Sequence, residues 1–163
     1  MRALVRSLPL LPLLLLASAC DVAGGPVGEF VGSVRGDQTL TLRWGGTFGS
    51  TEHLILSGGE EGAVYVGPFE AHLVGPGRYV IGRARSEGSY PTPADTFTAA
   101  LLLRNEGLTT HHFFSESGEL VLDAVTDEEV RGSLTFVGVD YRDPTRTVEV
   151  EGRFKAVYVP FCC

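Results

Sequence analysis

One cysteine, Cys20, follows a residue pattern that indicates covalent modification of its thiol. Arg2 and Arg6 come before an apolar run over residues 8–19, which ends in small residues. A basic start, a short apolar stretch and small residues before a cut site are typical of a secretory signal peptide. The run is shorter than the roughly 20 apolar residues that a bilayer-spanning helix needs. We therefore expect residues 1–19 to be removed during export.

The segment Ala17-Ser18-Ala19-Cys20 resembles the lipobox of bacterial lipoproteins, with Ala17 where Leu is commoner. Small residues let a peptidase reach the backbone, and only a thiol forms the thioether to a diacylglycerol. The resemblance implies that the mature chain begins at Cys20 with two acyl chains, such as palmitate, on its sulfur and in many bacteria a third on its amine. Two chains anchor stably, at about 0.8 kcal/mol for each buried CH₂. Ordinary secretory cleavage after Ala-Ser-Ala is the alternative.

The expected location is the bacterial cell envelope on its periplasmic side, with the lipid bilayer as partner through Cys20. Asp21 resembles the inner-membrane retention signal of enterobacteria-like sorting, but other bacterial groups do not obey that rule, so both membranes stay open. Residues 20–28 have the Gly and Pro content of a short linker. They are interpreted as the lipidated N-terminus and its connection to the domain.

Cleavage would make an acidic chain more acidic. All 20 acidic residues follow Cys20, so 11 basic residues (13 less Arg2 and Arg6) remain, and the formal net charge changes from −7 to −9. Binding to phosphates requires a basic surface, which argues against nucleic acid or an anionic membrane as a charge-driven partner. A mature chain of this length suits one domain.

Short alternating runs from Glu29 onward predict β-strands. The clearest covers residues 147–158, where Val148, Val150 and Phe154 alternate with charged residues, as in a strand with one wet face. Similar runs cover residues 39–44, 52–57, 77–84, 96–104 and 130–138. Glycine and proline separate the runs, at Gly45-Gly46, Gly58-Gly59, Gly75-Pro76-Gly77 and Asp143-Pro144.

These patterns predict an all-β fold. We expect a single antiparallel β-sandwich or open barrel of about 8–10 strands, because no apolar pattern keeps a helical period over three turns. The β domain is expected over residues 29–160, and residues 161–163 form a C-terminal tail. Cys162 and Cys163 in that tail are either an unselected end or a redox, metal or cross-linking pair.

From Gly118, the run GELVLDAVTDEEVRGSLTFVGVD followed by RTVEVEGRFKAVYV resembles the C-terminal half of small β-rich bacterial lipoproteins of unknown function. The resemblance covers residues 118–158 and rests on the strand pattern and the glycines. It implies an antiparallel β domain and supplies no active-site residue.

The adjacent His111 and His112 are the residues that most invite a metal or catalytic interpretation. Neighbours on a strand point to opposite faces, so the two rings cannot readily share one metal. His53 or His72 could complete a site, yet neither has HxH or HxxxH spacing to them. We predict solvent-facing histidines and no metal site. A hydrolase that uses His111 or His112 with carboxylates brought together by the fold is the alternative.

Two acidic clusters receive a structural interpretation. Asp123, Asp127, Glu128 and Glu129 lack the spacing of a calcium loop and fit a charged hairpin turn. The segment 140–143 is predicted to form a polar turn before Pro144. Neither cluster is assigned as a site.

Nucleophilic catalysis has no recognisable motif, since the G-x-S-x-G elbow is absent from the sequence. Aromatic side chains could form a platform for a sugar or peptide, and Tyr90 beside Pro91 is the one expected to be exposed. The candidates are Trp44, Tyr65, Tyr79, Tyr90, Phe113 and Phe114.

The sequence therefore predicts a membrane-anchored envelope lipoprotein whose β domain has a non-enzymatic binding or structural role. Cys20 is the one assigned site, and no catalytic residue, metal or cofactor is assigned. An envelope protein or a glycan is the expected partner, and the sequence sets no oligomeric state. The alternatives are the hydrolase and a carrier of a small apolar ligand.

Overall fold

The computed structural model describes residues 28–36, 39–49, 53–69, 74–84, 96–104 and 110–159. Within these ranges the chain forms β-strands and no helix, which confirms the all-β prediction. The nine strands are β1 Glu29–Arg35, β2 Thr39–Gly49, β3 Leu54–Ser57, β4 Gly62–Gly67, β5 Gly77–Ile81, β6 Thr96–Arg104, β7 Thr110–Val125, β8 Glu129–Asp140 and β9 Thr147–Val159.

Several predictions concern residues outside the described ranges. These are the signal peptide 1–19, the lipidation site Cys20, the linker up to residue 27 and the tail 161–163. In the described part of the chain, no helix is long and apolar enough to cross a membrane.

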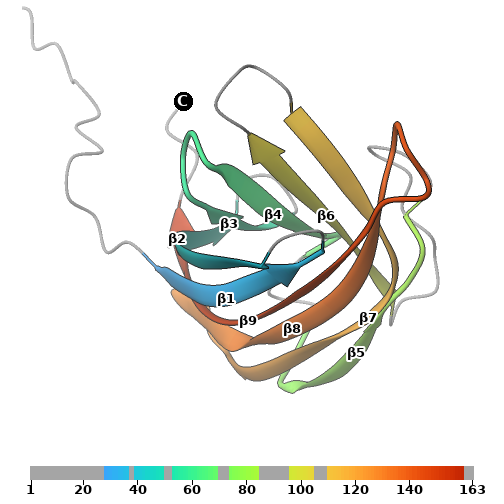
Figure 1. The fold of residues 1–163 in the computed structure, drawn as a ribbon. Coiled ribbons are helices and arrows are strands. Elements are labelled where there is room, and N and C mark those ends of the chain that lie inside the picture. Colours follow the sequence, from blue (N-terminus) through green and yellow to red (C-terminus); the bar gives the residue numbers. More distant parts are fainter. Residues whose placement is uncertain are drawn as a thin grey trace, which may run out of the picture.

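The strands form a closed barrel in the order β1-β2-β3-β4-β6-β5-β7-β8-β9, and β9 pairs with β1 to complete the circle (Figure 1). A barrel was one of the two arrangements expected, but the expected barrel was open, whereas the pairings here complete the circle. Most neighbours are antiparallel. Two short parallel pairings make the sheet mixed: residues 47–49 of β2 lie beside 157–159 of β9, and residues 80–81 of β5 lie beside 96–97 of β6.

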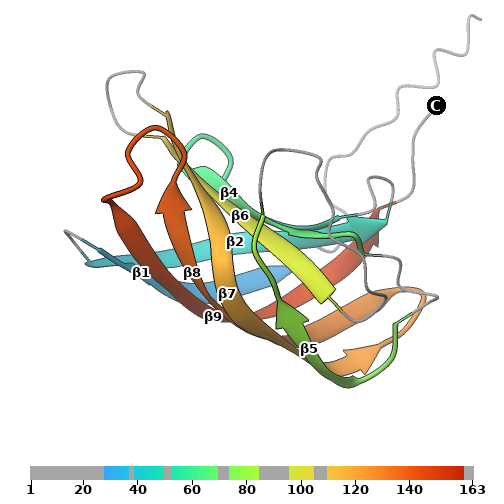
Figure 2. The same cartoon turned by 90° about the vertical axis from the view of Figure 1, so that its right-hand side faces the viewer.

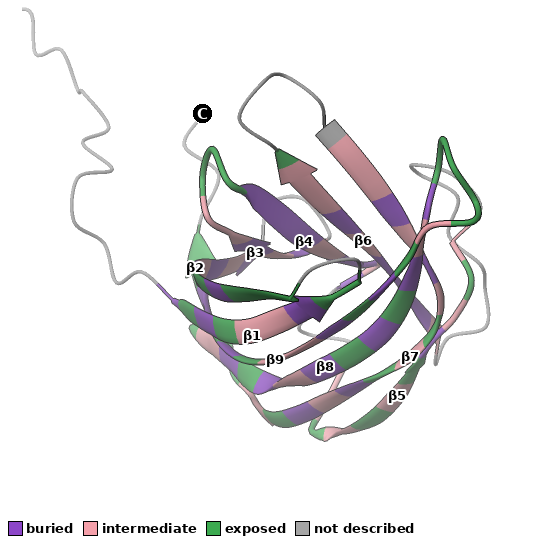
Figure 3. Cartoon of the chain, in the orientation of Figure 1, coloured by how far each residue is buried: buried purple, intermediate pink, exposed green. Residues whose placement is uncertain are grey.

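Long strands with strict alternation build one side of the barrel. β8 pairs with β7 and with β9 over eleven residue pairs each. Val130, Gly132, Leu134 and Phe136 of β8 are buried, while the residues that alternate with them are partly or fully exposed (Figure 3). A period of two puts successive side chains on opposite faces, so the apolar set fills the barrel and the polar set faces water.

The pair Gly45-Gly46 lies inside a strand, contrary to the predicted turn. β2 continues through it to Gly49. A Cβ on Gly46 would lie 2.8 Å from the backbone oxygen of Lys155, so only glycine permits this approach of β2 to β9. The glycines let β2 leave β1 and close the barrel on β9.

A buried serine joins three strands where β5 ends. The Ser115 hydroxyl donates a hydrogen bond to the Gly82 carbonyl (2.7 Å) and accepts one from the Ala99 amide (3.0 Å). β7 is irregular here, because Glu116 is skipped between the pairs made by Ser115 and Ser117. The bulge lets β7 change its neighbour from β6 to β5.

The two ends of the barrel differ in what they present. β1 begins at Glu29 opposite Lys155 of β9, and β9 ends near Gly49 of β2; we call this the N-terminal end. The loop 141–146 between β8 and β9 lies at the other end, which we call the loop end. Figure 1 shows the start of β1 at the left and this loop at the right.

Candidate functional site

Three polar side chains from three strands or their ends meet at the loop end. His111 lies near the start of β7, Asp140 ends β8 and Arg146 precedes β9. The His111 Nδ1 lies 3.0 Å from the Asp140 Oδ2 and 3.3 Å from the Arg146 Nη1. They meet because Phe113 pairs with Asp140 and Val139 pairs with Thr147. Figure 2 shows the β8–β9 loop above the ends of these strands, far from β5.

The Asp140 carboxylate is buried and fully used, with only 3% of its surface exposed. Its Oδ1 accepts the backbone N–H groups of Arg142 (2.8 Å) and Asp143 (3.3 Å), as in an Asx turn. Burial raises the pKa of Asp140, but the hydrogen bonds from these amides and from His111 together lower it more. The pKa of Asp140 therefore lies below its ordinary value, and the group is a carboxylate at neutral pH.

The arrangement decides which group donates within the cluster. An ionised carboxylate only accepts, so the His111 Nδ1–H donates to the Asp140 Oδ2. Arg146 cannot then donate to the same nitrogen, and its guanidinium lies beside the pair at 3.9 Å from the Asp140 Oδ2. Asp140 is thus compensated by one ring N–H, one guanidinium and two amides, as a buried charge requires.

The turn itself is held by further hydrogen bonds, which fits the polar turn predicted over 140–143. The Asp143 Oδ1 accepts the Thr145 hydroxyl (2.6 Å) and its amide (3.1 Å), and these bonds lower the pKa of Asp143. The amide of Asp140 donates to the Arg146 carbonyl at 3.0 Å, which closes the loop. The loop therefore has a defined conformation.

The exposed aromatic side chain of this loop is Tyr141. It is 68% exposed, and its ring meets the edge of Phe114 at a centroid distance of 5.9 Å. Its amide donates to the His112 carbonyl at 2.8 Å, which fixes the backbone beneath the ring. A held, exposed tyrosine offers an apolar face and a hydroxyl, a combination enriched at binding surfaces. Both Asp140 oxygens are already engaged within the cluster, so this carboxylate is not itself a free proton acceptor.

The histidines considered as a possible metal or catalytic site do not come together in the described structure. His111 is only 20% exposed, so the predicted solvent-facing position is wrong for this ring. His112 is its neighbour on β7, where adjacent side chains point to opposite faces. His53 lies elsewhere, with its ring 6.4 Å from that of Tyr65, and His72 is outside the described residues.

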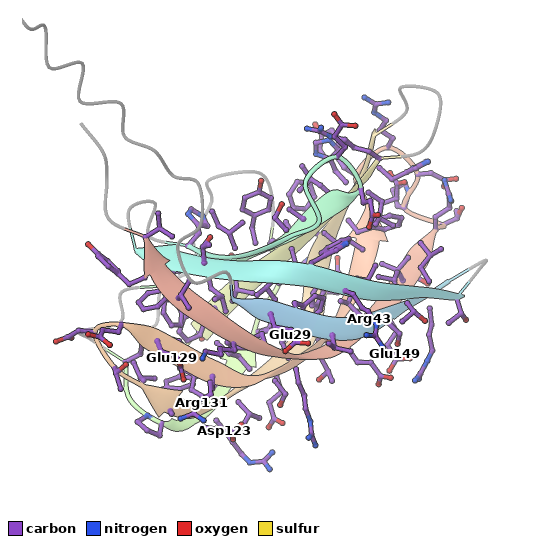
Figure 4. All side chains as sticks on the ribbon, turned by 90° about the vertical axis from the view of Figure 1, so that its left-hand side faces the viewer. Glu29, Arg43, Asp123, Glu129, Arg131 and Glu149 are labelled. Atoms are coloured by element: carbon purple, nitrogen blue, oxygen red, sulfur yellow. The ribbon has the colours of Figure 1, made fainter. Side chains whose placement is uncertain are left out.

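The first acidic cluster forms a charged turn and its flanks. Thr126 organises the β7–β8 turn, and its hydroxyl accepts the Glu129 amide at 2.9 Å. The Glu129 carboxylate binds Lys155 (2.6 Å) and Arg131 (2.8 Å), and the Lys155 hydrogen bond lowers the pKa of Glu129. Asp123 lies on the outer face of the sheet with Glu129 and Arg131 (Figure 4). Among the described residues, no group of three or more His, Cys, Asp or Glu could hold a metal ion.

Three of the six aromatic candidates, Trp44, Tyr79 and Phe113, belong to or pack against the core. Trp44 and Phe113 are buried, and the Trp44 Nε1 donates to the Glu61 carboxylate at 3.0 Å. Tyr79 packs on Phe97, with ring centroids 5.3 Å apart. Tyr90 lies outside the described residues. Among the described residues the most exposed aromatic is instead Tyr141, at 68%, and Tyr158 near the end of β9 is 48% exposed. The position of Tyr141 within a polar turn was the available sequence signal.

Comparison with known proteins adds no relative to this picture. No protein-family model, no curated protein and no solved structure matches the chain. Its role is therefore inferred from the residues and the geometry described above.

Proposed function

We propose that the chain is a bacterial envelope lipoprotein, anchored through Cys20, whose barrel is a non-enzymatic binding module. The observation that carries the proposal is that the start of the barrel domain and its exposed β8–β9 loop lie at opposite ends of the barrel. β1 starts at the N-terminal end, and the β8–β9 loop with Tyr141 lies at the opposite end. A lipid on Cys20 would hold the N-terminal end toward the bilayer and leave the loop end available to partners.

The linker length supports this orientation. Eight peptide bonds separate Cys20 from Gly28, and an extended chain spans at most about 3.3–3.6 Å per residue. The start of the barrel would then lie within roughly 30 Å of the acyl chains. Gly28 is also wedged between strands, because a Cβ there would lie 2.1 Å from the Gly46 oxygen and 2.2 Å from the Lys155 oxygen. The tether therefore meets the barrel at a firmly packed point.

One observation supports the hydrolase alternative, namely the 3.0 Å contact between His111 and Asp140. A catalytic pair of this kind orients a histidine toward a nucleophile. Here Asp140 also closes its own turn through Arg142 and Asp143, so a structural role accounts for its burial.

The carrier alternative is disfavoured by close packing near β1, where a Cβ on Gly32 or Gly152 would come within 2.7 Å of the Phe30 ring.

Metabolic labelling with an alkyne analogue of palmitate tests the anchor. The wild-type chain should carry label and fractionate with membranes, whereas Cys20→Ser should lose the label and accumulate as a precursor or as soluble protein. The double variant Cys162→Ser, Cys163→Ser is the matched control, since it removes the other two thiols and should keep both label and membrane location. Persistent labelling of Cys20→Ser would overturn the proposal.

A further inference from the structure

Strand β2 pairs over more residues with β1 than with β3. β1 pairs with β2 from Thr39 to Trp44, whereas β3 pairs with β2 only from Gly45 to Thr47. Among the described residues, no strand pairs with Thr39–Arg43 on the side away from β1. Within the described part of the chain, five consecutive residues of β2 therefore have one edge without a strand partner, toward the loop end of the barrel. A free edge exposes alternate backbone N–H and C=O groups that can pair with another strand.

Leu40 is more exposed than the other inward-facing residues of β2. It alternates with Leu42 and Trp44, which are 4% and 5% exposed, so all three belong to the inward face of β2. Leu40 is nevertheless 41% exposed. An inward side chain at the end of a barrel stays open to solvent when no strand flanks it. An added strand would cover Leu40 with an apolar side chain of its own.

Arg43 supplies a charge on the outer side of the same edge. Its exposed side chain belongs to the outer face that carries Glu149 (Figure 4), and among the described residues it takes part in no ion pair. Its neighbours on that face of β2, Thr39 and Thr41, are uncharged. A strand added at this edge would gain most from a carboxylate opposite Arg43.

We propose that the free edge of β2 binds an extended segment of a partner protein by strand addition. The segment would place an acidic side chain opposite Arg43 on the outer face and an apolar side chain opposite Leu40 on the inner face. Main-chain hydrogen bonds would provide affinity, and these two side chains would provide selectivity. The proposal rests on the binding role proposed above and names its partner as a protein segment.

A second copy of the chain fits this edge less well. Antiparallel pairing of two β2 strands would point the two barrels in opposite directions, because the strand direction reverses. Both N-terminal ends could not then face one bilayer. A separate extended segment has no such restriction, so it is the occupant that the anchored barrel favours.

The first test is site-specific photo-crosslinking in the intact envelope with the full chain. A photoreactive residue at Leu40 is compared with one at Val137, which is equally exposed at 40% but lies on β8, a strand paired on both sides. A third probe replaces Tyr141 at the loop end. We expect Leu40 to crosslink to one defined linear segment, identified by mass spectrometry, and Val137 to give background only.

The second test uses a synthetic peptide with the crosslinked sequence. Arg43→Glu should weaken its binding about fivefold, the effect of reversing one exposed charge pair. Arg153→Glu is the matched control, because Arg43 and Arg153 lie on either side of Val31 in the same register, but Arg153 is on a fully paired strand. The peptide should slow hydrogen exchange at alternate amides of Thr39–Arg43, since alternate residues face the edge.

The outcomes separate this inference from the anchor. Background crosslinking at Leu40, crosslinks to a second copy or to glycan, crosslinking from Tyr141 alone, or uniform protection of β2 would each overturn strand addition. Palmitate labelling is measured on the same samples. A wild-type chain that carries no lipid but still crosslinks at Leu40 would refute the lipid anchor and support strand addition at β2.

Discussion

The side of the barrel built by β7, β8 and β9 and the seam between β2 and β3 are closed with very different amounts of pairing. β8 pairs with each neighbour over eleven residue pairs, whereas β2 and β3 share three. The first side continues through long strands, joined by the tight β7–β8 turn and by the loop 141–146. The seam depends on a four-residue strand and on the close approach of β2 to β9 at Gly46. The comparison teaches that, among the described residues, one closed sheet can combine an extensively paired wall with a strand edge that has no strand partner.

The largest difference between the two regions is expected when one buried leucine from each is replaced by alanine. Leu134 on β8 and Leu56 on β3 are both buried, with 1% and 0% exposure. Leu134→Ala should lower the free energy of unfolding near the top of the usual range of about 2–5 kcal/mol, because its fully paired strand cannot move to refill the cavity. Leu56→Ala should fall near the bottom of that range. Urea denaturation measures both, and equal or reversed losses would contradict the proposed difference in rigidity.

An intermediate effect is expected at the loop end, where Asp140 joins β8 to the β8–β9 loop. Asp140→Asn should cost about 1–2 kcal/mol at neutral pH, because a charged hydrogen-bond acceptor is lost. The pKa of Asp140 is depressed in the folded state, so its contribution is complete above the unfolded pKa of about 4 and is lost as the pH falls through the folded pKa. The wild-type free energy of unfolding should thus fall more steeply below about pH 4 than that of the variant. Parallel pH profiles would refute this role.

The smallest effect is expected for an exposed ion pair that joins the short strand β5 to β7. Arg78 of β5 makes two hydrogen bonds to the Glu119 carboxylate, at 3.0 and 2.9 Å, but its side chain is 74% exposed. Arg78→Ala should change the free energy of unfolding by no more than about 0.5 kcal/mol, because water and salt screen exposed pairs. Thermal unfolding at low and high salt checks this. A larger, salt-independent loss would mean that this pair helps to hold β5 in the barrel.

Sequence reasoning located the strands better than their connections. The run predicted over residues 96–104 matches β6, and the predicted strands over 130–138 and 147–158 match β8 and β9 within two residues at each end. It placed a turn at Gly45-Gly46, because the pair has turn composition, although it serves a close approach to Lys155. Local composition cannot distinguish a glycine that turns the chain from one that lets two backbones meet.

The candidate site was predictable only in parts. The turn after Asp140 followed from its composition, but the contact between His111 and Asp140 joins residues 29 positions apart. That contact depends on the register of β7 against β8, which a bulge at Glu116 shifts by one residue. The interpretation of His111 as solvent-facing was wrong because neither the register nor the loop above the ring is encoded by nearby residues.

The sequence by itself determined the period-two strands, the turn-rich connections, the acidic charge and the expectation of a lipid on Cys20. These are local properties, since alternation, turn composition and an export signal each lie within a short stretch of chain. Only the tertiary structure decided the strand order, the burial of Asp140 beside His111 and the edge of Thr39–Arg43 that no described strand covers. Those features depend on strand lengths and registers around the whole circle. The barrel leaves an edge because β3 is too short to follow β2 along its length.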